Sequence, residues 1–318
     1  MTATLGPLDI LAITFPIFAI IALGYGAVKS HYFPKDGVRF LSFFVIQVAI
    51  PSMLFKALSE KHINEIFDLE FFAAYTVGSL ITFAVMLWFH LRNQHGLTHS
   101  ALAAAGSTSS NTAFVGLPIA LAYLGERAIV GVALVLIIEN VIVLPLILAL
   151  AEKGLTKEKS FFEALLVAIK NLVKSPLIIA ATIGIVFSIL DLKLPGPLTK
   201  VVSMFAAASG GVALFVIGGF LVGISTKGMI PKISVIAFGK LFIHPLIVFG
   251  ILLILPQFDP VLQATAVLLA AMPMFGIYPI IGQRFGEEKV CAAALLLTTT
   301  LSFATISGLL WLLHYLNY

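Results

Sequence analysis

One acidic residue, Glu139, lies inside the apolar run 135–143, far from any loop. An unpaired carboxylate at the centre of a bilayer costs about 2.5 kcal/mol or more, so this side chain must pair, bind a cation or hold a proton. Asn140 is its nearest polar neighbour. A structural hydrogen bond between helices is the alternative interpretation. We predict a site for a proton or a coupling ion at Glu139 and Asn140.

Two other apolar stretches are interrupted by Gly and Pro in the same order. Both follow the pattern Phe, three residues, Pro, six residues, Gly-Glu, with the members Phe114, Pro118, Gly125 and Glu126, and Phe275, Pro279, Gly286 and Glu287. Proline is well placed as the first residue of a new helical segment. Backbone groups freed in hydrocarbon need partners or a wet cavity, and new helix N-termini suit an anion. A simple proline kink is the alternative.

These interruptions predict the substrate site. Paired breaks in corresponding places of two halves are the strongest sequence indication of a transporter's binding site. The amide of Asn111 at this depth needs a partner, whereas its counterpart in the second stretch is Met272, so the site cannot be chemically symmetric. The predicted substrate-binding residues are Asn111, Thr112, Gly116, Pro118, Gly276, Tyr278 and Pro279.

Three further polar residues are minor candidates. Lys240 and His244 share a helical face at i, i+4. We expect Lys240 to extend toward the cytosol, because long cationic side chains commonly do so, and His244 to pack as a satisfied buried histidine. Gln47, four residues before Pro51, is expected to line the cavity.

No motif for enzymatic chemistry is present. The sequence lacks a Gly-x4-Gly-Lys-Ser/Thr loop, a His-Glu-x-x-His motif and a pair of intramembrane aspartates. Cys291 is the only cysteine, which excludes an intrachain disulfide and a cysteine-rich metal site. We therefore predict neither catalytic residues nor a metal site, and no cofactor beyond a coupling proton or sodium ion.

The composition predicts an all-α polytopic membrane protein. Of 318 residues, 60% are hydrophobic and 11% charged, and the mean hydropathy is +1.10. Apolar runs of about 20 residues are long enough to span the hydrocarbon core. We predict ten spans, at 8–28, 38–57, 70–91, 99–124, 127–150, 164–190, 197–222, 232–255, 260–285 and 288–314. The net charge of +4 is scattered over loops, so the expected partner is the lipid bilayer and no nucleic acid.

The basic residues predict the orientation. Most of them fall on alternate connections, and cytoplasmic loops are those that retain Lys and Arg. Both termini are thus expected outside the cytoplasm, in a multi-pass protein of the inner or plasma membrane. No cationic residue precedes Lys29, so the first apolar run is expected to be retained rather than cleaved as a signal peptide.

Matches at a constant offset predict an internal duplication. Pro16 and Gly24 recur 160 residues later as Pro176 and Gly184, as Phe55 does as Phe215, and the two interruptions lie 161 apart. A unit of five spans must insert in opposite orientations in its two copies. The predicted units are 1–150 and 161–318, joined by a charged cytosolic linker at 151–160.

The sequence resembles the auxin efflux carrier family. The resemblance covers nearly the whole chain and rests on Asn111-Thr112 followed by Gly116 and Pro118, on the break at Pro279, and on the run Ile50-Pro51-Ser52-Met53-Leu54-Phe55. It implies a fold similar to bile-acid symporters and sodium/proton antiporters. Spans 1, 2, 6 and 7 would form a scaffold, and spans 3–5 and 8–10 a transport domain in which the broken helices 4 and 9 cross. A homodimer is a further expectation.

The resemblance also implies a function. Its members move organic anions, so we expect a secondary transporter of a small mono- or dicarboxylate, coupled to a proton or sodium ion, with an elevator-like alternating-access mechanism. The alternatives are a passive anion channel or uniporter, and a membrane-embedded sensor or enzyme. The chain lacks a long hydrophilic loop between its halves, and Met272 stands where the family pattern has asparagine. Both departures indicate a compact microbial relative rather than an auxin carrier.

Overall fold

The computed structural model describes residues 7–60, 68–155, 166 and 174–315. Within them every regular element is helical, and seven helices are long and apolar enough to cross a membrane. The helices are α1 (Pro7–Lys29), α2 (Lys35–Phe44), α3 (Ile50–Ser59), α5 (Leu69–Arg92), α6 (Leu97–Thr108), α7 (Leu117–Leu124), α8 (Ala128–Ile138), α9 (Leu144–Leu155), α11 (Pro176–Ile189), α12 (Gly196–Phe220), α13 (Ile230–Phe238), α14 (His244–Leu252), α15 (Pro260–Ala270), α16 (Tyr278–Arg284) and α17 (Glu288–Tyr315). The predicted all-α, multi-pass class is confirmed.

The predicted spans coincide with these helices to within a few residues wherever the structure describes them. Three apolar segments are shorter than a full span, namely Thr112–Leu124, Pro176–Ile189 and Pro260–Ala270. The first and third belong to spans that are interrupted. For the second, most of the preceding part of span 164–190 and half of the predicted linker lie outside the described residues. The count of ten spans and their inverted arrangement stay predictions.

The described residues contain four short π-helical turns, each of which leads directly into the next helix and ends two residues before a proline. They are η1 (Val45–Ala49), η2 (Thr112–Gly116), η3 (Glu139–Val143) and η4 (Gly239–Ile243), followed by Pro51, Pro118, Pro145 and Pro245. In each turn, the amide of the residue before the proline donates a hydrogen bond to the carbonyl oxygen five residues earlier, as Leu144 does to Glu139. A proline ring pushes away the carbonyl four residues earlier and has no amide hydrogen, which explains the widened turn.

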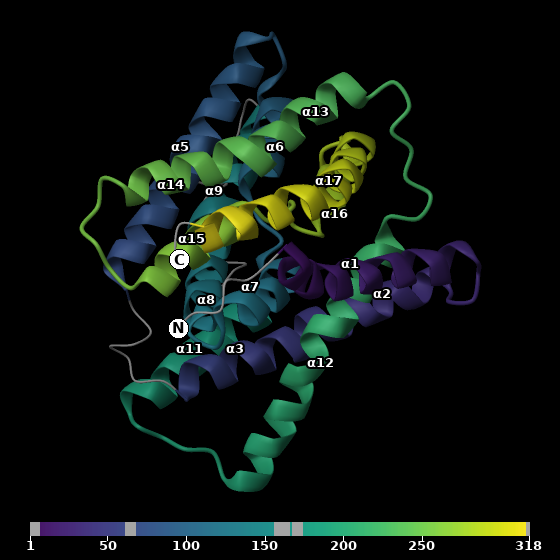
Figure 1. Cartoon of the computed structure of the whole chain (residues 1–318). Coiled ribbons are helices and arrows are strands. Elements are labelled where there is room, and N and C mark those ends of the chain that lie inside the picture. Colours follow the sequence, from purple (N-terminus) through teal and green to yellow (C-terminus); the bar gives the residue numbers. More distant parts are fainter. Residues whose placement is uncertain (1–6, 61–67, 156–165, 167–173, 316–318) are drawn as a thin grey trace.

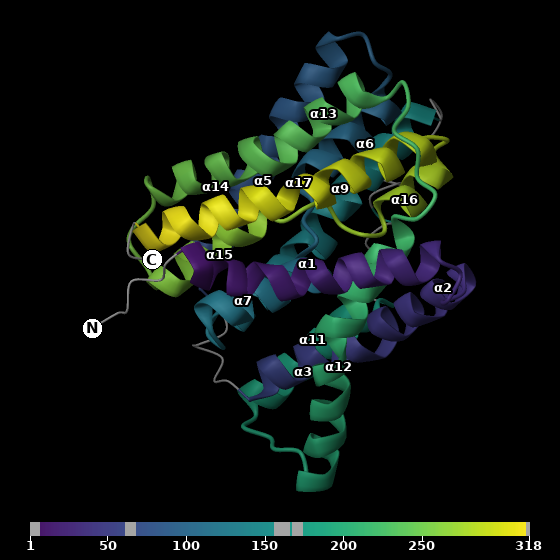
Figure 2. The ribbon, with the colours of Figure 1, turned by 45° about the vertical axis from the view of Figure 1, so that its right-hand side comes forward.

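The helices pack in two groups. We call α1, α2, α3, α11 and α12 the α12 group, because α12 contacts α1, α2 and α3, and α11 packs on α3. The α15 group contains α5–α9 and α13–α17; its member α7 packs on α8 and α15 and also contacts α1. Figures 1 and 2 show the α12 group in the lower part of the molecule and most of the α15 group above it. The two interrupted segments lie on the side of the α15 group that faces the α12 group, since η2 contacts α12 and Gly276 lies against Ile217 of α12.

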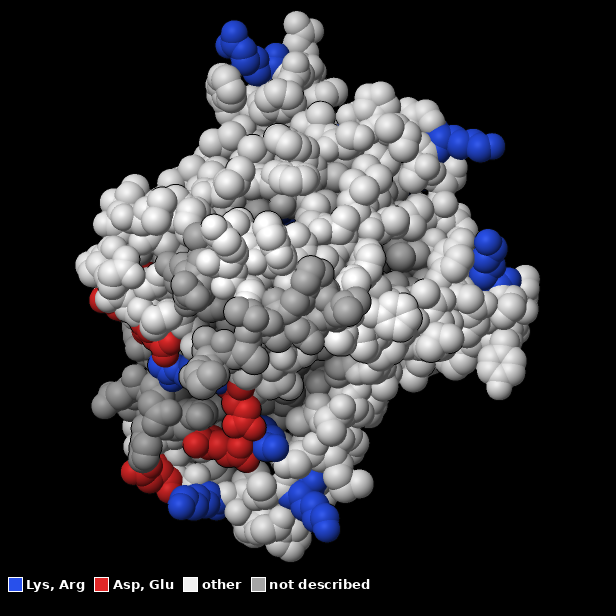
Figure 3. All heavy atoms as spheres, in the orientation of Figure 1, with Lys and Arg blue, Asp and Glu red and all other residues white. Residues whose placement is uncertain are grey.

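Charges avoid the middle of the face in Figure 3. Most of the visible Lys and Arg side chains lie toward its margins, and Asp and Glu gather at the lower left, so the described residues in its upper middle are almost all uncharged. Exposed apolar side chains such as Phe15, Leu23 and Trp88 cover the membrane-length helices. An uncharged apolar belt of this kind is what contact with lipid chains requires.

Glycines allow α1 and α12 to approach until their backbones touch. A Cβ on Gly218 would overlap the carbonyl oxygen of Ile21, and one on Gly24 would overlap the carbonyl oxygen of Phe215. Small residues at such crossings permit the close van der Waals packing that holds membrane helices together. The α1–α12 contact is thus a fixed element of the α12 group.

We expect Gly218→Ala to lower the melting temperature of the purified protein by several degrees. The added methyl group has only backbone to displace, and overpacking of this kind costs about 1–3 kcal/mol. Gly26→Ala is the matched control, because Gly26 lies in α1 with open space around its Cβ position. There the greater helix propensity of alanine should leave stability equal or higher. Equal melting temperatures for the two variants would contradict the close crossing.

Candidate functional site

The two interruptions meet at the centre of the molecule. The helix α6 ends at Thr108, and Ser110 pairs with Met274 of the second interruption in an isolated antiparallel bridge. The amide of Asn111 donates to the carbonyl oxygen of Pro273 at 2.7 Å. Each break thus satisfies peptide groups of the other, which hydrocarbon could not do. Gly125 and Gly286, which follow the two half-helices, both have positive φ, at 74° and 76°.

Glu139 holds the start of the first interruption. It begins η3 and is 8% exposed. Its Oε1 accepts the Ser110 amide at 2.7 Å and the Tyr75 hydroxyl at 3.2 Å, and its Oε2 accepts the Thr112 hydroxyl at 3.2 Å. The alternative interpretation, a structural hydrogen bond between helices, is found with Tyr75 of α5 rather than with Asn140, whose amide donates to the carbonyl of Leu136 at 2.7 Å. Glu139 therefore stabilises the broken backbone directly.

Lys240 does not extend to the surface as expected. It is 0% exposed, and its Nζ donates to the Ala270 carbonyl at 2.6 Å and to Ser110 Oγ at 2.8 Å. The turn η4 directs the side chain inward, and Ala270 is the last residue of α15. A cation is stabilised at a helix C-terminus, where carbonyls lack intrahelical partners. The expectation for Lys240 was wrong because it ignored this acceptor.

His244 is a satisfied buried histidine, as expected. Its Nδ1 lies 2.9 Å from Lys240 Nζ, and its Nε2 lies 3.1 Å from Ser79 Oγ. The ammonium of Lys240 has only protons to offer, so Nδ1 accepts and Nε2 carries the hydrogen that Ser79 accepts. His244 fixes the position of Lys240 and does not contact the cavity described next.

Ser110 connects the buried carboxylate and the buried ammonium. Its amide binds Glu139, and its hydroxyl binds Lys240 at 2.8 Å and lies 3.2 Å from the Tyr75 hydroxyl. Removing one member of such a buried charge pair leaves the other uncompensated, which costs several kcal/mol. Nothing in the sequence distinguishes Ser110 from its neighbouring serines, and neither Tyr75 nor Ser79 was predicted. Their sequence surroundings are ordinary, and only the packing of α5 against α8, η4 and α14 reveals them.

A cavity of about 130 Å³ lies beside this network, between the two helix groups. It exceeds the 10–15 Å³ that one water molecule needs and is smaller than a drug-sized pocket. Its lining includes Ser42, Ile50, Ser109, Ser110, Asn111, Thr112, Phe114, Glu139, Asn140, Ile217, Phe220, Phe275 and Gly276. Asn111 is 2% exposed, and its Nδ2 has no hydrogen-bond partner among the described residues.

The structure divides the residues predicted from sequence. Asn111, Thr112, Gly276, Glu139 and Asn140 line the cavity, whereas the others do not: Gly116, Pro118, Tyr278, Pro279, Gln47, Lys240 and His244. Tyr278 is buried and donates to the Leu102 carbonyl at 2.8 Å, so it braces α16 against α6. Gln47 is exposed, because η1 turns Ile46 and Ile50 toward the cavity instead.

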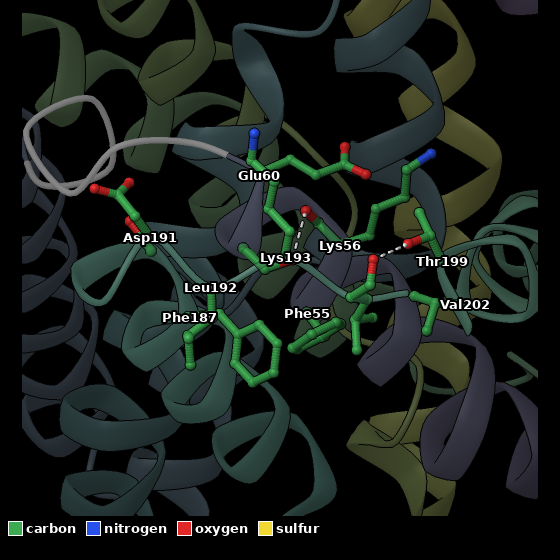
Figure 4. A pocket seen from close by; sticks show the side chains of 12 residues that line it. Phe55, Lys56, Glu60, Phe187, Asp191, Leu192, Lys193, Thr199 and Val202 are labelled. Carbon is green, nitrogen blue, oxygen red and sulfur yellow. Dashed lines mark hydrogen bonds between the residues drawn. The ribbon is translucent and has the colours of Figure 1, made fainter. Parts of the chain in front are cut away.

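A larger cavity, of about 670 Å³, lies at the end of α3 and the α11–α12 connection. Figure 4 shows charged side chains of both signs around it, with Phe55 and Phe187 among them. The two rings pack edge to face at 5.2 Å. None of the residues that line this cavity belongs to either interruption. It lacks the freed backbone that marks the smaller cavity.

Comparison with known proteins places the chain among transporters. A family model described as "Membrane transport protein" matches residues 10–312. The "Putative malonate transporter" of Rhizobium meliloti (strain 1021) is 29% identical over 96% of both chains. "Uncharacterized transporter YfdV" of Escherichia coli (strain K12) is 26% identical, over 93% of this chain and 95% of its own length. Auxin efflux carrier component 5 of Arabidopsis thaliana is 25% identical, over 65% of this chain and 68% of its own.

We expect Glu139→Gln and Lys240→Met each to lower the melting temperature, and the double variant to lower it by less than the sum. Either single change leaves a buried charge uncompensated, at a cost of about 3–5 kcal/mol, and the second change removes that charge. Groups that share a partner, here Ser110, show interaction energies of about 0.5–3 kcal/mol.

Thermal unfolding of the four purified proteins in one detergent measures this coupling. The control is Glu139→Gln combined with Lys56→Met, because Lys56 lies at the larger cavity and shares no partner with Glu139. Additive shifts for the Glu139 and Lys240 variants would show that Ser110 does not connect the two charges.

Proposed function

The chain belongs to the membrane transport protein family that includes the auxin efflux carriers, and on this premise we propose that it carries a small organic anion across the membrane by alternating access. Members of the family are transporters rather than enzymes. The multi-pass apolar helices agree with that role. We propose the plasma membrane as its location, with both termini outside the cytoplasm, since the basic residues favour cytoplasmic loops.

The observation that carries the proposal is the side-chain amide nitrogen of Asn111, Nδ2, which has no hydrogen-bond partner among the described residues and lies in a small cavity formed by two broken helices. Asn111 precedes the segment 112–124, whose first amides have no acceptor within their own helix. Amides at a helix N-terminus can bind a carboxylate without a cation, and the Asn111 Nδ2 adds a donor that has no partner among the described residues. Asn111 and Thr112 are therefore proposed to contact the anion.

The substrate is proposed to be a small mono- or dicarboxylate. The cavity of about 130 Å³ suits a solute of few heavy atoms and leaves no room for a bulky ring system beside Phe114, Phe220 and Phe275. The relative from Rhizobium meliloti, named for malonate, supports a short dicarboxylate. Malonate is accordingly the first compound to test.

Coupling is proposed to run through Glu139. The carboxylate lines the cavity and also accepts the Ser110 amide and the Thr112 hydroxyl, the two groups that flank Asn111. Protonating Glu139, or drawing it toward a sodium ion, would weaken these bonds and change the geometry of the break. Binding of the anion and of the coupling ion would thus depend on each other.

The packing supports an elevator-like movement of the α15 group against the α12 group. The cavity lies between the groups, and Ile217 and Phe220 of α12 close it on one side. The contacts also suggest twofold symmetry: Gly24 lies on the Phe215 backbone, and Gly184 lies on the Phe55 backbone. Gly184 is the equivalent of Gly24, and Phe215 is the equivalent of Phe55, each at an offset of 160 residues. The two contacts are therefore related to each other as two inverted copies require.

We expect Asn111→Ala to reduce uptake of labelled malonate into proteoliposomes about tenfold or more at low substrate concentration. Loss of a hydrogen bond to a charged group costs about 1.5–3 kcal/mol, and 1.4 kcal/mol is a factor of ten in affinity. Gln47→Ala is the matched control, because it removes an exposed amide from another π-helical turn outside the cavity.

A linear, unsaturable flux in the wild-type protein would instead indicate a passive channel. Wild-type uptake by Asn111→Ala would remove this residue from the substrate site.

We expect Glu139→Gln to abolish the effect of a pH or sodium gradient on uptake while slow exchange of labelled for unlabelled malonate persists. The amide cannot gain or lose a proton at accessible pH, but it still accepts hydrogen bonds. Uptake is measured with each gradient alone, at matched protein content after detergent screening for folded protein. A variant that retains the wild-type response to either gradient would exclude Glu139 as the coupling residue.

A further inference from the structure

Three histidines meet where α5 ends and α6 begins, away from the cavity. His90 lies in the last turn of α5, His95 in the connection and His99 in the first turns of α6. One ring nitrogen of each lies within 4.8 Å of the others. The ring centroids of His95 and His99 are 4.7 Å apart, and that of His90 is 5.8 Å from the first and 6.1 Å from the second. Figure 1 shows this turn at the top of the molecule.

The backbone itself brings His90 and His95 together. Gln94 has a positive φ of 60°, and its amide donates to the Leu91 carbonyl at 3.0 Å. The His95 amide donates to the His90 carbonyl at 3.3 Å. These two bonds form a Schellman motif, which stacks the residue after the turn on the third residue from the helix end. Apolar side chains usually occupy both places, and here both are imidazoles.

His90 is buried without a hydrogen-bond partner. It is 4% exposed, and neither Nδ1 nor Nε2 has a partner among the described residues. An imidazole always carries at least one donor, and leaving a buried polar group unsatisfied costs about 1–3 kcal/mol. No residue of the proposed transport site touches it, so the transport mechanism does not account for it. A ligand that accepts a lone pair from a ring nitrogen would account for this buried imidazole.

His99 is oriented by a carboxylate. Its Nδ1 lies 3.0 Å from Oε1 of Glu287, in the turn between α16 and α17. The carboxylate accepts a hydrogen bond from Nδ1–H, which leaves the lone pair on Nε2 of the neutral ring free. Metal-bound histidines have this arrangement almost without exception, with the second ring nitrogen on a carboxylate or a carbonyl. Glu287 also supplies negative charge near a cation.

We propose that His90, His95 and His99 bind a divalent transition metal ion, with zinc as the best match, and that Glu287 orients His99 in this site. Three neutral imidazoles and one open position are typical of tetrahedral zinc. Zinc–nitrogen bonds of about 2.0–2.1 Å place the ligand nitrogens about 3.3 Å apart, so the rings must close by up to roughly 1.5 Å. His95 and His99 are partly exposed and have space for that rotation. The motifs considered in the sequence did not include this spacing.

The ion would join α5, α6 and the α16–α17 turn, all within the α15 group. It would stiffen the end of this group without tying it to the α12 group, so metal binding does not interfere with the proposed movement between groups. Zinc binding by these histidines does not depend on the substrate or on transport.

The test is zinc binding by the full-length chain, purified without a polyhistidine tag and stripped with a chelator. Calorimetric titration with zinc should give one ion per chain, and zinc should raise the melting temperature, because a ligand that binds only the folded state stabilises it. His95→Ala and His99→Ala should each weaken binding at least about 100-fold and abolish the thermal shift. Glu287→Gln should weaken it about 10- to 100-fold, since it removes only the orienting partner.

The control is His314→Ala, which removes a histidine near the end of α17 that lies outside the cluster. It should bind zinc like the wild type. His90→Ala does not serve as a test of zinc binding, because a change at this buried position can unfold the protein. Absence of saturable binding in the wild type, or wild-type affinity in both His95→Ala and His99→Ala, would overturn the proposal.

Discussion

Peptide groups that leave a helix inside a membrane must find partners in the protein, and this constraint determines the centre of the molecule. The interruption after Thr108 frees the backbone amides of Ser110 and Asn111, which donate hydrogen bonds to the Glu139 carboxylate and to the Pro273 carbonyl, respectively. The end of α15 leaves the Ala270 carbonyl free, and this carbonyl accepts a hydrogen bond from Lys240. Two charged side chains that would each be costly in hydrocarbon are retained here because each completes a broken backbone. The cavity lies where these partners keep each of the two segments from forming one continuous helix.

The π-helical turns before Pro51, Pro118, Pro145 and Pro245 explain how ordinary apolar helices present polar groups at that centre. A π-helical turn contains one more residue than the α-helix would have there, so it rotates the face of the helix beyond it. Glu139 opens one such turn, and Lys240 lies in another. Both point inward, although α8 before the first turn and α14 after the second show almost no amphipathic pattern to predict a direction. A proline thus changes the backbone locally, through the π-helical turn before it, and in this way determines which distant residues a side chain contacts.

The same turns explain which features could be predicted from the sequence. Span positions follow from length and hydropathy, and the interruptions follow from glycine and proline, which act locally. Glu139 was identified because the cost of its burial does not depend on the fold. Lys240 was placed wrongly, because its direction depends on η4 and on the helix end of a distant segment. Gln47 was placed wrongly for the same reason at η1, and Tyr278 serves as a brace that only the contact with Leu102 reveals.

The charge balance of the site has a consequence for the proposed transport. In the proposed duplication, the equivalent of Lys240 is Ser79, 161 residues earlier, so each charge occurs in one copy only. With Glu139 ionised and Lys240 protonated, the network is neutral, and a bound monocarboxylate gives the moving group a net charge of −1. Carrying this charge through a low-dielectric layer is costly, whereas a proton on Glu139 restores neutrality. For a monocarboxylate, the empty network and the anion loaded with a proton would then cross with equal charge, which favours a proton over uncoupled passage; for a dianion such as malonate, the proton removes one of the two negative charges. The duplicated backbone would supply the cavity, and the unduplicated charges would supply the coupling.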